Sequence, residues 1–294
     1  MHRLMYPEIG FVMLRFVDYL FQAFTLGVVE GITEFLPISS TGHLIVTEHL
    51  LGFRDQSNTF TVVIQIGAIL AVVLFYWRDL LARVTGLFTG QKNAWQFWLK
   101  LVVATIPAAV LGLLLEDILS AFDTPLTVAI SLIVGGILLY WLETARSKTQ
   151  GVPEPLEPQI DHISLRQAFL VGCFQVLALL FPGTSRSGAS IVGGWLVGLN
   201  RVTATAFSFY LGIPTLGAAG LYKLYKARDQ LSNLPGGATA LLVGSVVSLI
   251  TAFLAVSWLL RYVSRNNFKG FAIYRIVAGG VILLLLALNM MPNA

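Results

Sequence analysis

Charged residues and cysteine are both scarce in this sequence. Only 12% of the 294 residues are charged, about half of the roughly 25% that soluble domains carry, so the chain cannot build a water-soluble surface. The one cysteine, Cys173, lies in an apolar run, which excludes a disulfide framework and a cysteine-rich metal site. The formal net charge of +4 is too small to indicate a nucleic-acid partner. What the chain has in excess is apolar sequence, with 56% hydrophobic residues and a mean hydropathy of +0.78.

Long apolar segments predict a polytopic all-α membrane protein. A membrane-crossing helix needs about 20 mostly apolar residues, and six segments come close to this length. We expect these six to be transmembrane helices: 60–77, 97–115, 125–142, 204–222, 238–260 and 270–289. The first fifteen residues lack a cleavage site of small residues, so we do not expect a removable signal peptide there.

Two further apolar stretches, 20–51 and 167–199, are interrupted by polar and helix-breaking residues. Each is long enough for two half-helices with a hinge between them, at Pro37 and at Pro182. Non-helical backbone at membrane depth is tolerated only where it is buried in protein or lines a wet cavity. We therefore interpret both stretches as re-entrant helical hairpins. The alternative is an ordinary pair of kinked spans.

The two halves of the chain resemble each other, which predicts an internal repeat within a single membrane domain, 1–294. Three residues of the first half align without gaps onto three of the second: Gly27, Glu30 and Pro37 onto Gly172, Gln175 and Pro182. The first repeat covers 20–143 and the second 165–290, each with one hairpin and three spans. Because three is odd, the second repeat enters the membrane with the opposite orientation. In such inverted repeats the functional site lies near the midplane, where the broken elements meet.

Basic residues are shared unevenly between the two predicted ends of the spans. The connections around 78–100, 146–166 and 261–269 carry more Lys and Arg than those on the opposite side, around 54 and 223–228. The positive-inside rule makes the first side cytoplasmic. Both termini are then expected to face outward, and the first hairpin is expected to enter the membrane from the outside.

The first hinge region concentrates ionisable and hydroxyl side chains in apolar sequence. Glu30 and Glu34 are spaced i,i+4 and share a helix face, where they repel each other unless a cation or a shared proton lies between them. The hinge that follows carries three hydroxyls and a histidine: Ser39, Ser40, Thr41 and His43. The hydroxyls can cap the next half-helix and leave backbone N–H groups free to hold an anion. His43 is a candidate nucleophile or general acid/base. The alternative is that the carboxylates are solvated at a hairpin mouth and His43 is a satisfied core histidine.

The second hinge region, from Pro182 to Ser190, combines hydroxyls with one arginine. Its hydroxyl candidates for binding a ligand are Thr184, Ser185 and Ser187. The guanidinium of Arg186 is always charged and matches phosphate oxygens bidentately. We expect it to form a phosphate cradle with the hydroxyls and free backbone amides; an ion pair with Glu30 or Glu34 is the alternative. Gln65, in the first full span, is a further candidate for lining the same cavity, unless it serves helix–helix packing.

Both hinge regions resemble the signatures of a known family. The stretch from Val29 to His43 and the stretch from Pro182 to Gly188 look like the two motifs of the bacterial undecaprenyl-diphosphate phosphatases, the bacitracin-resistance family. The resemblance covers the whole chain in length, motif order and span pattern. It implies removal of the terminal phosphate from undecaprenyl diphosphate, which recycles the monophosphate carrier lipid for peptidoglycan synthesis. It also implies a bacterial inner-membrane location, an active site facing the periplasm and a divalent cation, Mg²⁺ or Ca²⁺.

On the family pattern, five residues take the functional positions: Glu30, Glu34, Ser40, His43 and Arg186. We expect the two glutamates to hold the divalent cation, while the cation and Arg186 offset the charge on the phosphoryl group as it transfers. The sequence leaves the nucleophile open: Ser40 or His43 attacks the terminal phosphorus, or His43 activates a water.

The expected partners are the polyprenyl diphosphate substrate and membrane lipid, and a second copy of the chain in a homodimer is a further candidate. A transporter or flippase of a polyprenyl phosphate lipid is the rival hypothesis. Inverted repeats with broken helices at the midplane are also the architecture of secondary transporters.

Overall fold

The computed structural model describes residues 6–53, 59–120, 124–147, 157–228 and 236–292, with the side chains of 6–14, 116–120, 146–147 and 227 excepted. Within these ranges the chain is helical and contains no strand. The prediction of an all-α protein is therefore confirmed for the described residues. Three basic residues of the loops compared above lie outside the side chains that are described: Arg54, Arg146 and Lys148.

Each predicted apolar span coincides with one long helix. These helices are α3 (Thr59–Phe75), α5 (Lys92–Ser120), α6 (Pro125–Ser147), α10 (Arg201–Ala227), α11 (Gly237–Val263) and α12 (Lys269–Ala287). All but α3 are long and apolar enough to cross a membrane, which gives five candidate spans in the described residues. A sixth is counted only if α3 and the helix that follows it are taken together as one bent span.

The bend after α3 departs from the predicted span at 60–77. Helix α3 ends at Phe75, and α4 (Trp77–Phe88) continues at an angle of 75°. Neither proline nor glycine occurs at the break. Side-chain contacts to α10 hold the bend instead, because the ring of Tyr210 packs at a tilt against Tyr76 with centroids 4.3 Å apart, and its hydroxyl donates a hydrogen bond of 2.6 Å to Asp79 of α4.

Both predicted hinges interrupt the helices at the expected places. The first separates α1 (Tyr6–Thr33) from α2 (Ser40–Leu51), and α1 starts earlier than the predicted residue 20. The second separates α7 (Leu165–Gln175) and the short α8 (Leu177–Leu180) from α9 (Arg186–Leu196). Pro37 and Pro182 lie inside these breaks, because proline lacks the N–H that a helix interior requires. The second break also contains Gly183 in a positive-φ conformation (φ 93°).

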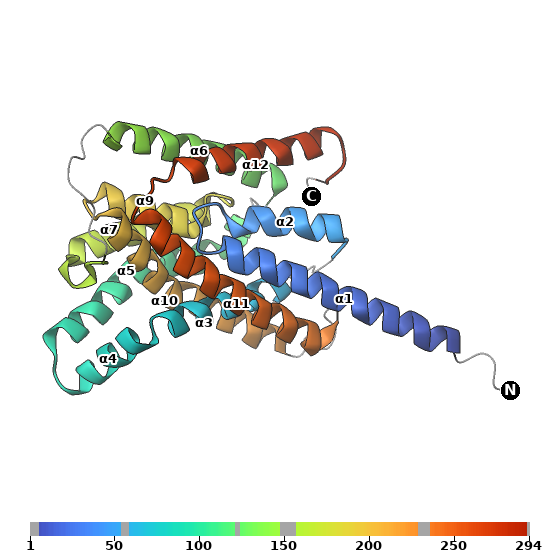
Figure 1. Ribbon diagram of the computed structural model, residues 1–294, viewed down its shortest axis with the longest axis horizontal. Coiled ribbons are helices and arrows are strands. Elements are labelled where there is room, and N and C mark those ends of the chain that lie inside the picture. The colour runs from blue at the N-terminus through green and yellow to red at the C-terminus, as the bar shows by residue number, and fades with distance from the viewer. Residues whose placement is uncertain (1–5, 54–58, 121–123, 148–156, 229–235, 293–294) are drawn as a thin grey trace.

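The helices pack so that the hinges meet in the interior. Helix α11 packs against α1 and α3, α5 packs against α7, and α6 lies beside α12 along one edge of the molecule (Figure 1). Helix α10 runs through the centre in contact with α3, α5 and α9. The largest fully buried side chains include Phe35 of the first hinge and Phe209 of α10, whose rings meet edge to face at 5.3 Å. The core therefore forms directly behind the hinges.

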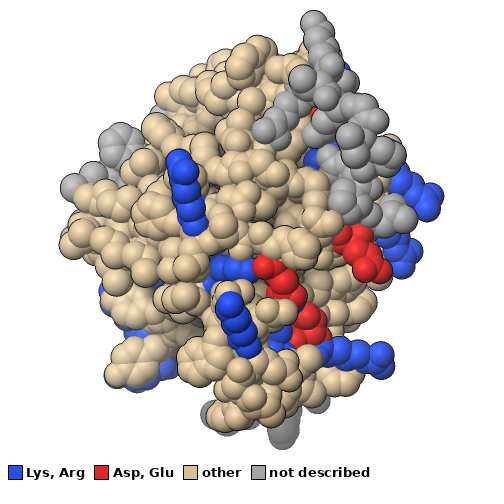
Figure 2. Space-filling model, turned by 90° about the vertical axis from the view of Figure 1, so that its left-hand side faces the viewer, with Lys and Arg blue, Asp and Glu red and all other residues tan. Residues whose placement is uncertain are grey.

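Charged side chains gather at the end of the molecule that carries the α4–α5 connection and α7. Figure 2 views this end and shows its Lys and Arg side chains together with Asp and Glu side chains on a surface that is otherwise made of uncharged residues. Arg83 of α4 donates to Asp79 at 2.8 Å and to Asp161 of the short 3₁₀ helix Ile160–His162 at 2.7 Å. The N-terminal end of α1 and the C-terminal end of α12 both lie at the opposite end (Figure 1).

The contact between α3 and α11 generates a stability prediction. A Cβ added at Gly67 would overlap the carbonyl oxygen of Ser245, whereas a Cβ at Gly280 of α12 meets no atom within 4 Å. We expect Gly67→Ala to lower the free energy of unfolding by about 1–3 kcal/mol and Gly280→Ala to leave it unchanged or raise it slightly. Thermal unfolding of both purified variants in detergent measures the difference. Equal midpoints would show that the helices are not in this close contact.

Candidate active site

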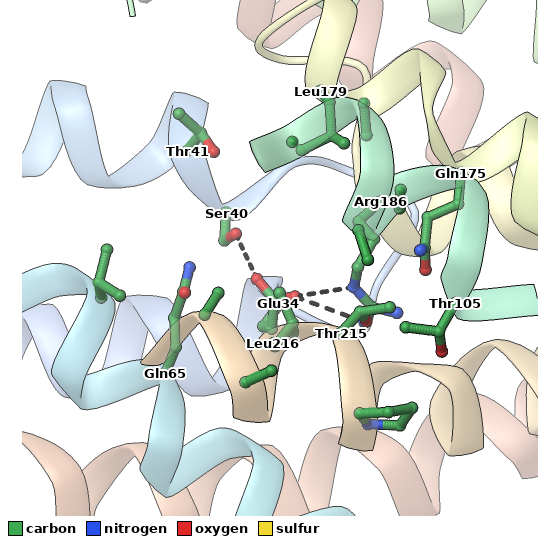
Figure 3. A pocket seen from close by; sticks show the side chains of 18 of the residues that line it. Glu34, Ser40, Thr41, Gln65, Thr105, Gln175, Leu179, Arg186, Thr215 and Leu216 are labelled. Atoms are coloured by element: carbon green, nitrogen blue, oxygen red, sulfur yellow. Dashed lines mark hydrogen bonds and ion pairs between the residues drawn. The ribbon is translucent and has the colours of Figure 1, made fainter. Parts of the chain in front are cut away.

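A cavity of about 580 Å³ lies between the two hinges and helices α3, α5 and α10 (Figure 3). One part of its wall is polar and comes mainly from the hinges: Glu34, Ser39, Ser40, Thr41, Ser185 and Arg186. Gln65 of α3 and Gln175 of α7 add two amides. The rest of the wall is mostly apolar and includes small residues of α5 and α10, such as Ala109, Gly112 and Ala218. The cavity therefore combines a polar wall with an apolar arm.

Glu34 lies at the centre of the polar wall. Ser40 donates its hydroxyl proton to Oε2 of Glu34 at 2.6 Å, and Arg186 directs Nε and Nη2 to Oε1, each at 3.4 Å (Figure 3). A third guanidinium nitrogen, Nη1, donates to the carbonyl of Ser208 at 3.1 Å. The ion pair considered above as an alternative is thus present. It is long for a charge-assisted bond, and Arg186 remains part of the cavity wall.

Two serines set the backbone at the hinges. Ser39 is the N-cap of α2 and Ser185 the N-cap of α9, with φ values of 70° and 71°. Each side chain accepts a hydrogen bond from the backbone N–H three residues on, at Gly42 and Gly188. The capping predicted for the helix after the first hinge is confirmed. A positive φ is strained for a residue with a side chain, and such strain concentrates at functional sites. The first turns of both helices thus begin at the cavity wall, where helix N-termini favour anions.

Glu30 is completely buried next to this site. Neither of its carboxylate oxygens has a hydrogen-bond partner in the part of the chain that the structure describes. A buried carboxylate without partners is costly, so these oxygens fit a cation that binds between Glu30 and Glu34. Among the described side chains, no group of three or more His, Cys, Asp or Glu is placed to hold a metal ion. Two carboxylates completed by water and substrate oxygens are a usual arrangement for Mg²⁺.

His43 lies on the side of α2 that faces α12 and is not part of the cavity wall. Its Nδ1 is 2.7 Å from the carbonyl oxygen of Ser39, and its Nε2 is 2.6 Å from the hydroxyl of Tyr274. Because a carbonyl only accepts, Nδ1 carries the proton, and Nε2 of the neutral ring accepts from Tyr274. Both ring nitrogens are therefore engaged, and neither points at the cavity.

The remaining predicted residues divide between the cavity and the packing behind it. Thr41, Gln65 and Ser185 line the cavity. Thr184 and Ser187 do not; Ser187 is fully buried and donates to the carbonyl of Leu36 in the other hinge at 2.9 Å.

Sequence reasoning missed a buried cation beside the hinges. Arg275 of α12 is 3% exposed and donates to the main chain of both hinges. The sequence alone could have indicated this residue, because Arg275 is the one charged residue in the predicted span 270–289. An ionisable residue at membrane depth is a functional candidate by default.

Comparison with known proteins identifies the family. Residues 23–281 match the model of the family described as bacitracin resistance protein BacA. The chain belongs to the BacA family. It is 49% identical to a protein named undecaprenyl-diphosphatase from Deinococcus radiodurans over 282 residues, which cover 94% of this chain and 98% of that protein. Proteins of the same name from Deinococcus deserti and a Polaromonas species are 48% and 47% identical, and the matches cover 92% and 91% of this chain and 97% and 95% of those proteins.

The BacA match includes every residue of the site, from Glu30 to Arg275. It begins after the start of α1, so the N-terminal part of that helix lies outside the family match. The resemblance inferred from the two hinge motifs is therefore confirmed, and the chain is a member of a bacterial family of membrane enzymes.

The buried ion pair generates a prediction about charge balance. The side chains of Arg186 and Glu34 are 11% and 5% exposed, so Arg186→Gln leaves an uncompensated buried carboxylate. We expect this variant to lose about 3–5 kcal/mol of unfolding free energy and the double variant Arg186→Gln/Glu34→Gln to lose less than the sum of the two single changes. Thermal unfolding in detergent provides the four values of the cycle.

Asp79, which contacts Tyr210 and Arg83, provides the control. Asp79→Asn combined with Arg186→Gln should be additive, because the two side chains share no partner. Additive losses for Glu34 and Arg186 as well would contradict an ion pair between them.

Proposed function

We propose that this protein is an undecaprenyl-diphosphatase that releases the terminal phosphate of undecaprenyl diphosphate and so recycles undecaprenyl phosphate for peptidoglycan synthesis. The observation that carries the proposal is the cluster around Glu34, where a serine hydroxyl and an arginine meet one carboxylate at the polar wall of a cavity with an apolar arm. The relatives that share the name undecaprenyl-diphosphatase over nearly the whole chain support the substrate.

Ser40 is the nucleophile in this proposal. Its hydroxyl is 2.6 Å from Glu34, so the carboxylate can take the proton as Oγ attacks the terminal phosphorus. The Oγ–P bond forms, the bond from phosphorus to the bridging oxygen breaks, and undecaprenyl phosphate leaves. A water then attacks the phosphoserine and releases inorganic phosphate. His43 is the weaker candidate, since both of its ring nitrogens are already hydrogen-bonded away from the cavity.

Arg186 and the helix N-termini bind the phosphate groups. The guanidinium contacts Glu34 at 3.4 Å on two nitrogens, long enough that phosphoryl oxygens can compete for the same donors. The backbone N–H groups at the start of α2 and α9 add positive potential at the same wall. These groups offset the charge of the phosphoryl group as it transfers.

Glu30 and Glu34 are proposed to hold a divalent cation, Mg²⁺ or Ca²⁺. The support is the pair of unpartnered oxygens on fully buried Glu30, one helical turn from Glu34. When bound, such an ion supplies Lewis-acid stabilisation to phosphate oxygens. Glu34 would then be shared by the ion, Arg186 and the hydroxyl of Ser40.

The membrane arrangement is proposed to be an inverted repeat in the bacterial inner membrane. The capping serines Ser39 and Ser185 have φ and ψ values within 12° of each other, as two copies of one hinge should. The helix contacts between the two repeats are also equivalent. Helix α1 of the first repeat packs on α11 of the second, and α7 of the second repeat packs on α5 of the first, which is the counterpart of α11. The six-span count, the repeat bounds 20–143 and 165–290, and the homodimer stay predictions.

The periplasmic orientation of the site rests on the distribution of charge. The basic side chains predicted to be cytoplasmic include those of α4 and the α4–α5 connection, at the end of the molecule opposite to the outer ends of α1 and α12 (Figures 1 and 2). Tyr222 and Lys223, near the C-terminal end of α10, line the cavity. The cavity therefore extends toward the end of α10 that the charge rule assigns to the periplasm.

The assignment of Ser40 and Glu34 is tested by phosphate release from undecaprenyl diphosphate in detergent. Transport needs two compartments and hydrolysis does not, so release by the wild-type protein separates the phosphatase from a flippase. We expect Ser40→Ala and Glu34→Gln each to lower kcat by about 10²–10⁴-fold, because the nucleophile or its base is lost. The matched control is Ser248→Ala, which also removes a buried hydroxyl, in α11 and outside the cavity. Release at the wild-type rate by Ser40→Ala would rule out a serine nucleophile.

The apolar arm generates a prediction about the lipid chain. Gly112 lines the cavity, and its nearest neighbour for an added Cβ is Leu179 at 3.8 Å, so Gly112→Leu fills open space. We expect KM for undecaprenyl diphosphate to rise about tenfold or more, while hydrolysis of a short-chain prenyl diphosphate is unchanged. Gly217→Leu, on α10 but outside the lining, is the control. An equal rise in KM for both substrates would show that the lipid chain does not bind beside Gly112.

A further inference from the structure

Arg275 of α12 connects the main chains of both hinges. Its Nη1 donates to the carbonyl of Pro37 at 3.4 Å, and its Nη2 donates to the carbonyls of Gly183 and Ser131, each at 3.3 Å. Pro37 belongs to the hinge that carries Ser40, and Gly183 to the hinge that carries Arg186. One guanidinium therefore spans the gap between the two halves of the site.

The surroundings of Arg275 are unusual for a stabilising contact. The side chain is 3% exposed, has no ion-pair partner among the described residues, and leaves its Nε without a hydrogen bond. Close approach depends on two glycines, because a Cβ at Gly135 would overlap Nη2 and a Cβ at Gly188 would lie 3.1 Å from Nη1. Burying a cation without an anion is unfavourable, so stability alone does not account for an arginine here.

The preceding residue, Tyr274, reaches the first hinge by a different route. Its hydroxyl donates to Nε2 of His43 at 2.6 Å, its ring stacks on the imidazole at 5.5 Å and 3°, and Nδ1 of His43 donates to the carbonyl of Ser39 at 2.7 Å. Ser39 holds the positive-φ turn directly before Ser40. This chain of contacts fixes the peptide that carries the proposed nucleophile.

We propose that Tyr274 and Arg275 are positioning residues that fix the two hinges at the spacing where Ser40, Glu34 and Arg186 meet, and that His43 belongs to this support. The proposal rests on the proposed function. It follows from the geometry that two consecutive residues of one helix contact the backbone beside the nucleophile and beside the phosphate clamp. A displacement of about 1 Å in such groups costs on the order of 10²-fold in rate, so the support acts on kcat.

The experiment compares four single variants and one double variant, all purified, for kcat, KM and thermal midpoint with undecaprenyl diphosphate. Arg275→Lys keeps the charge, but its single nitrogen cannot reproduce the planar fork that reaches both hinges. We expect kcat to fall about 10–100-fold with KM within about twofold, since the cavity wall keeps its binding groups. Arg201→Lys is the matched control: the side chain of Arg201 is 12% exposed, pairs with Glu143 at 2.9 Å and is not part of the cavity wall. It should lower the thermal midpoint with little change in kcat.

Tyr274→Phe keeps the proposal testable if Arg275→Lys does not fold, because it removes one hydroxyl from a side chain that is 46% exposed. We expect a fall in kcat of about tenfold at an unchanged thermal midpoint. His43→Gln should lose a similar factor, and the double variant should lose no more than His43→Gln alone, because both residues act through Ser39.

The outcomes distinguish the proposed positioning role of Tyr274 and Arg275 from the proposed phosphatase activity. If the wild-type protein releases no phosphate, the proposed function fails. If it does, and both Arg275→Lys and Tyr274→Phe retain wild-type kcat, the positioning role is wrong while the phosphatase stands. If His43→Gln lowers kcat by two orders of magnitude more than Tyr274→Phe does, His43 takes part in the chemical step and not only in positioning.

Discussion

The ion pair between Glu34 and Arg186 joins two segments that are 152 residues apart in the chain, and the interior is arranged around it. Burying charges of this kind in apolar surroundings is costly unless polar groups surround them. Serine hydroxyls, main-chain carbonyls and helix N-termini therefore gather at the same place. Ser185 and Ser187 donate from the second hinge to Leu36 of the first, Ser208 of α10 bonds Ser190, and Ser40 bonds Glu34 within the first hinge. The apolar helices around them supply the low-dielectric enclosure in which a few polar contacts have large effects.

Breaking a helix is what makes these groups usable. An unbroken membrane helix satisfies its own N–H and C=O groups and offers a ligand only side chains. The hinges at Pro37 and Pro182 interrupt that pattern, and Ser39 and Ser185 turn the backbone so that a new helix starts against the cavity. Arg275 donates hydrogen bonds to two main-chain carbonyls inside the breaks, those of Pro37 and Gly183. Glu30 and Gln175, which both have a buried oxygen without a hydrogen-bond partner in the described part of the chain, lie at equivalent positions of the proposed repeats.

Much of the fold was readable from local patterns, and the remainder depended on contacts distant in sequence. Apolar length gave the six long helices, and proline followed by serine gave the hinges and their caps. The turn at Tyr76 could not be read, because Tyr210 and not the local sequence holds it. The partner of Ser40 was likewise hidden, because the turn between Glu34 and Ser40 brings the carboxylate to 2.6 Å from the hydroxyl. His43 faces Tyr274, which is 231 residues away. Arg275 was visible as a lone charge in an apolar span, but nothing local identified the hinges as its partners.

Leu113 both lines the cavity and is 73% exposed on the outer face of α5. A wall residue that is also exposed on a helix apolar enough to cross a membrane places part of the cavity wall next to the lipid. For a lipid substrate, the quantity that sets occupancy is then the mole fraction in the plane of the membrane, and not a molarity in water. Other lipids dilute such a substrate without removing any of it, and the product returns to the same two-dimensional pool. The surface density of the carrier lipid, rather than its total amount, would thereby govern the flux through the enzyme.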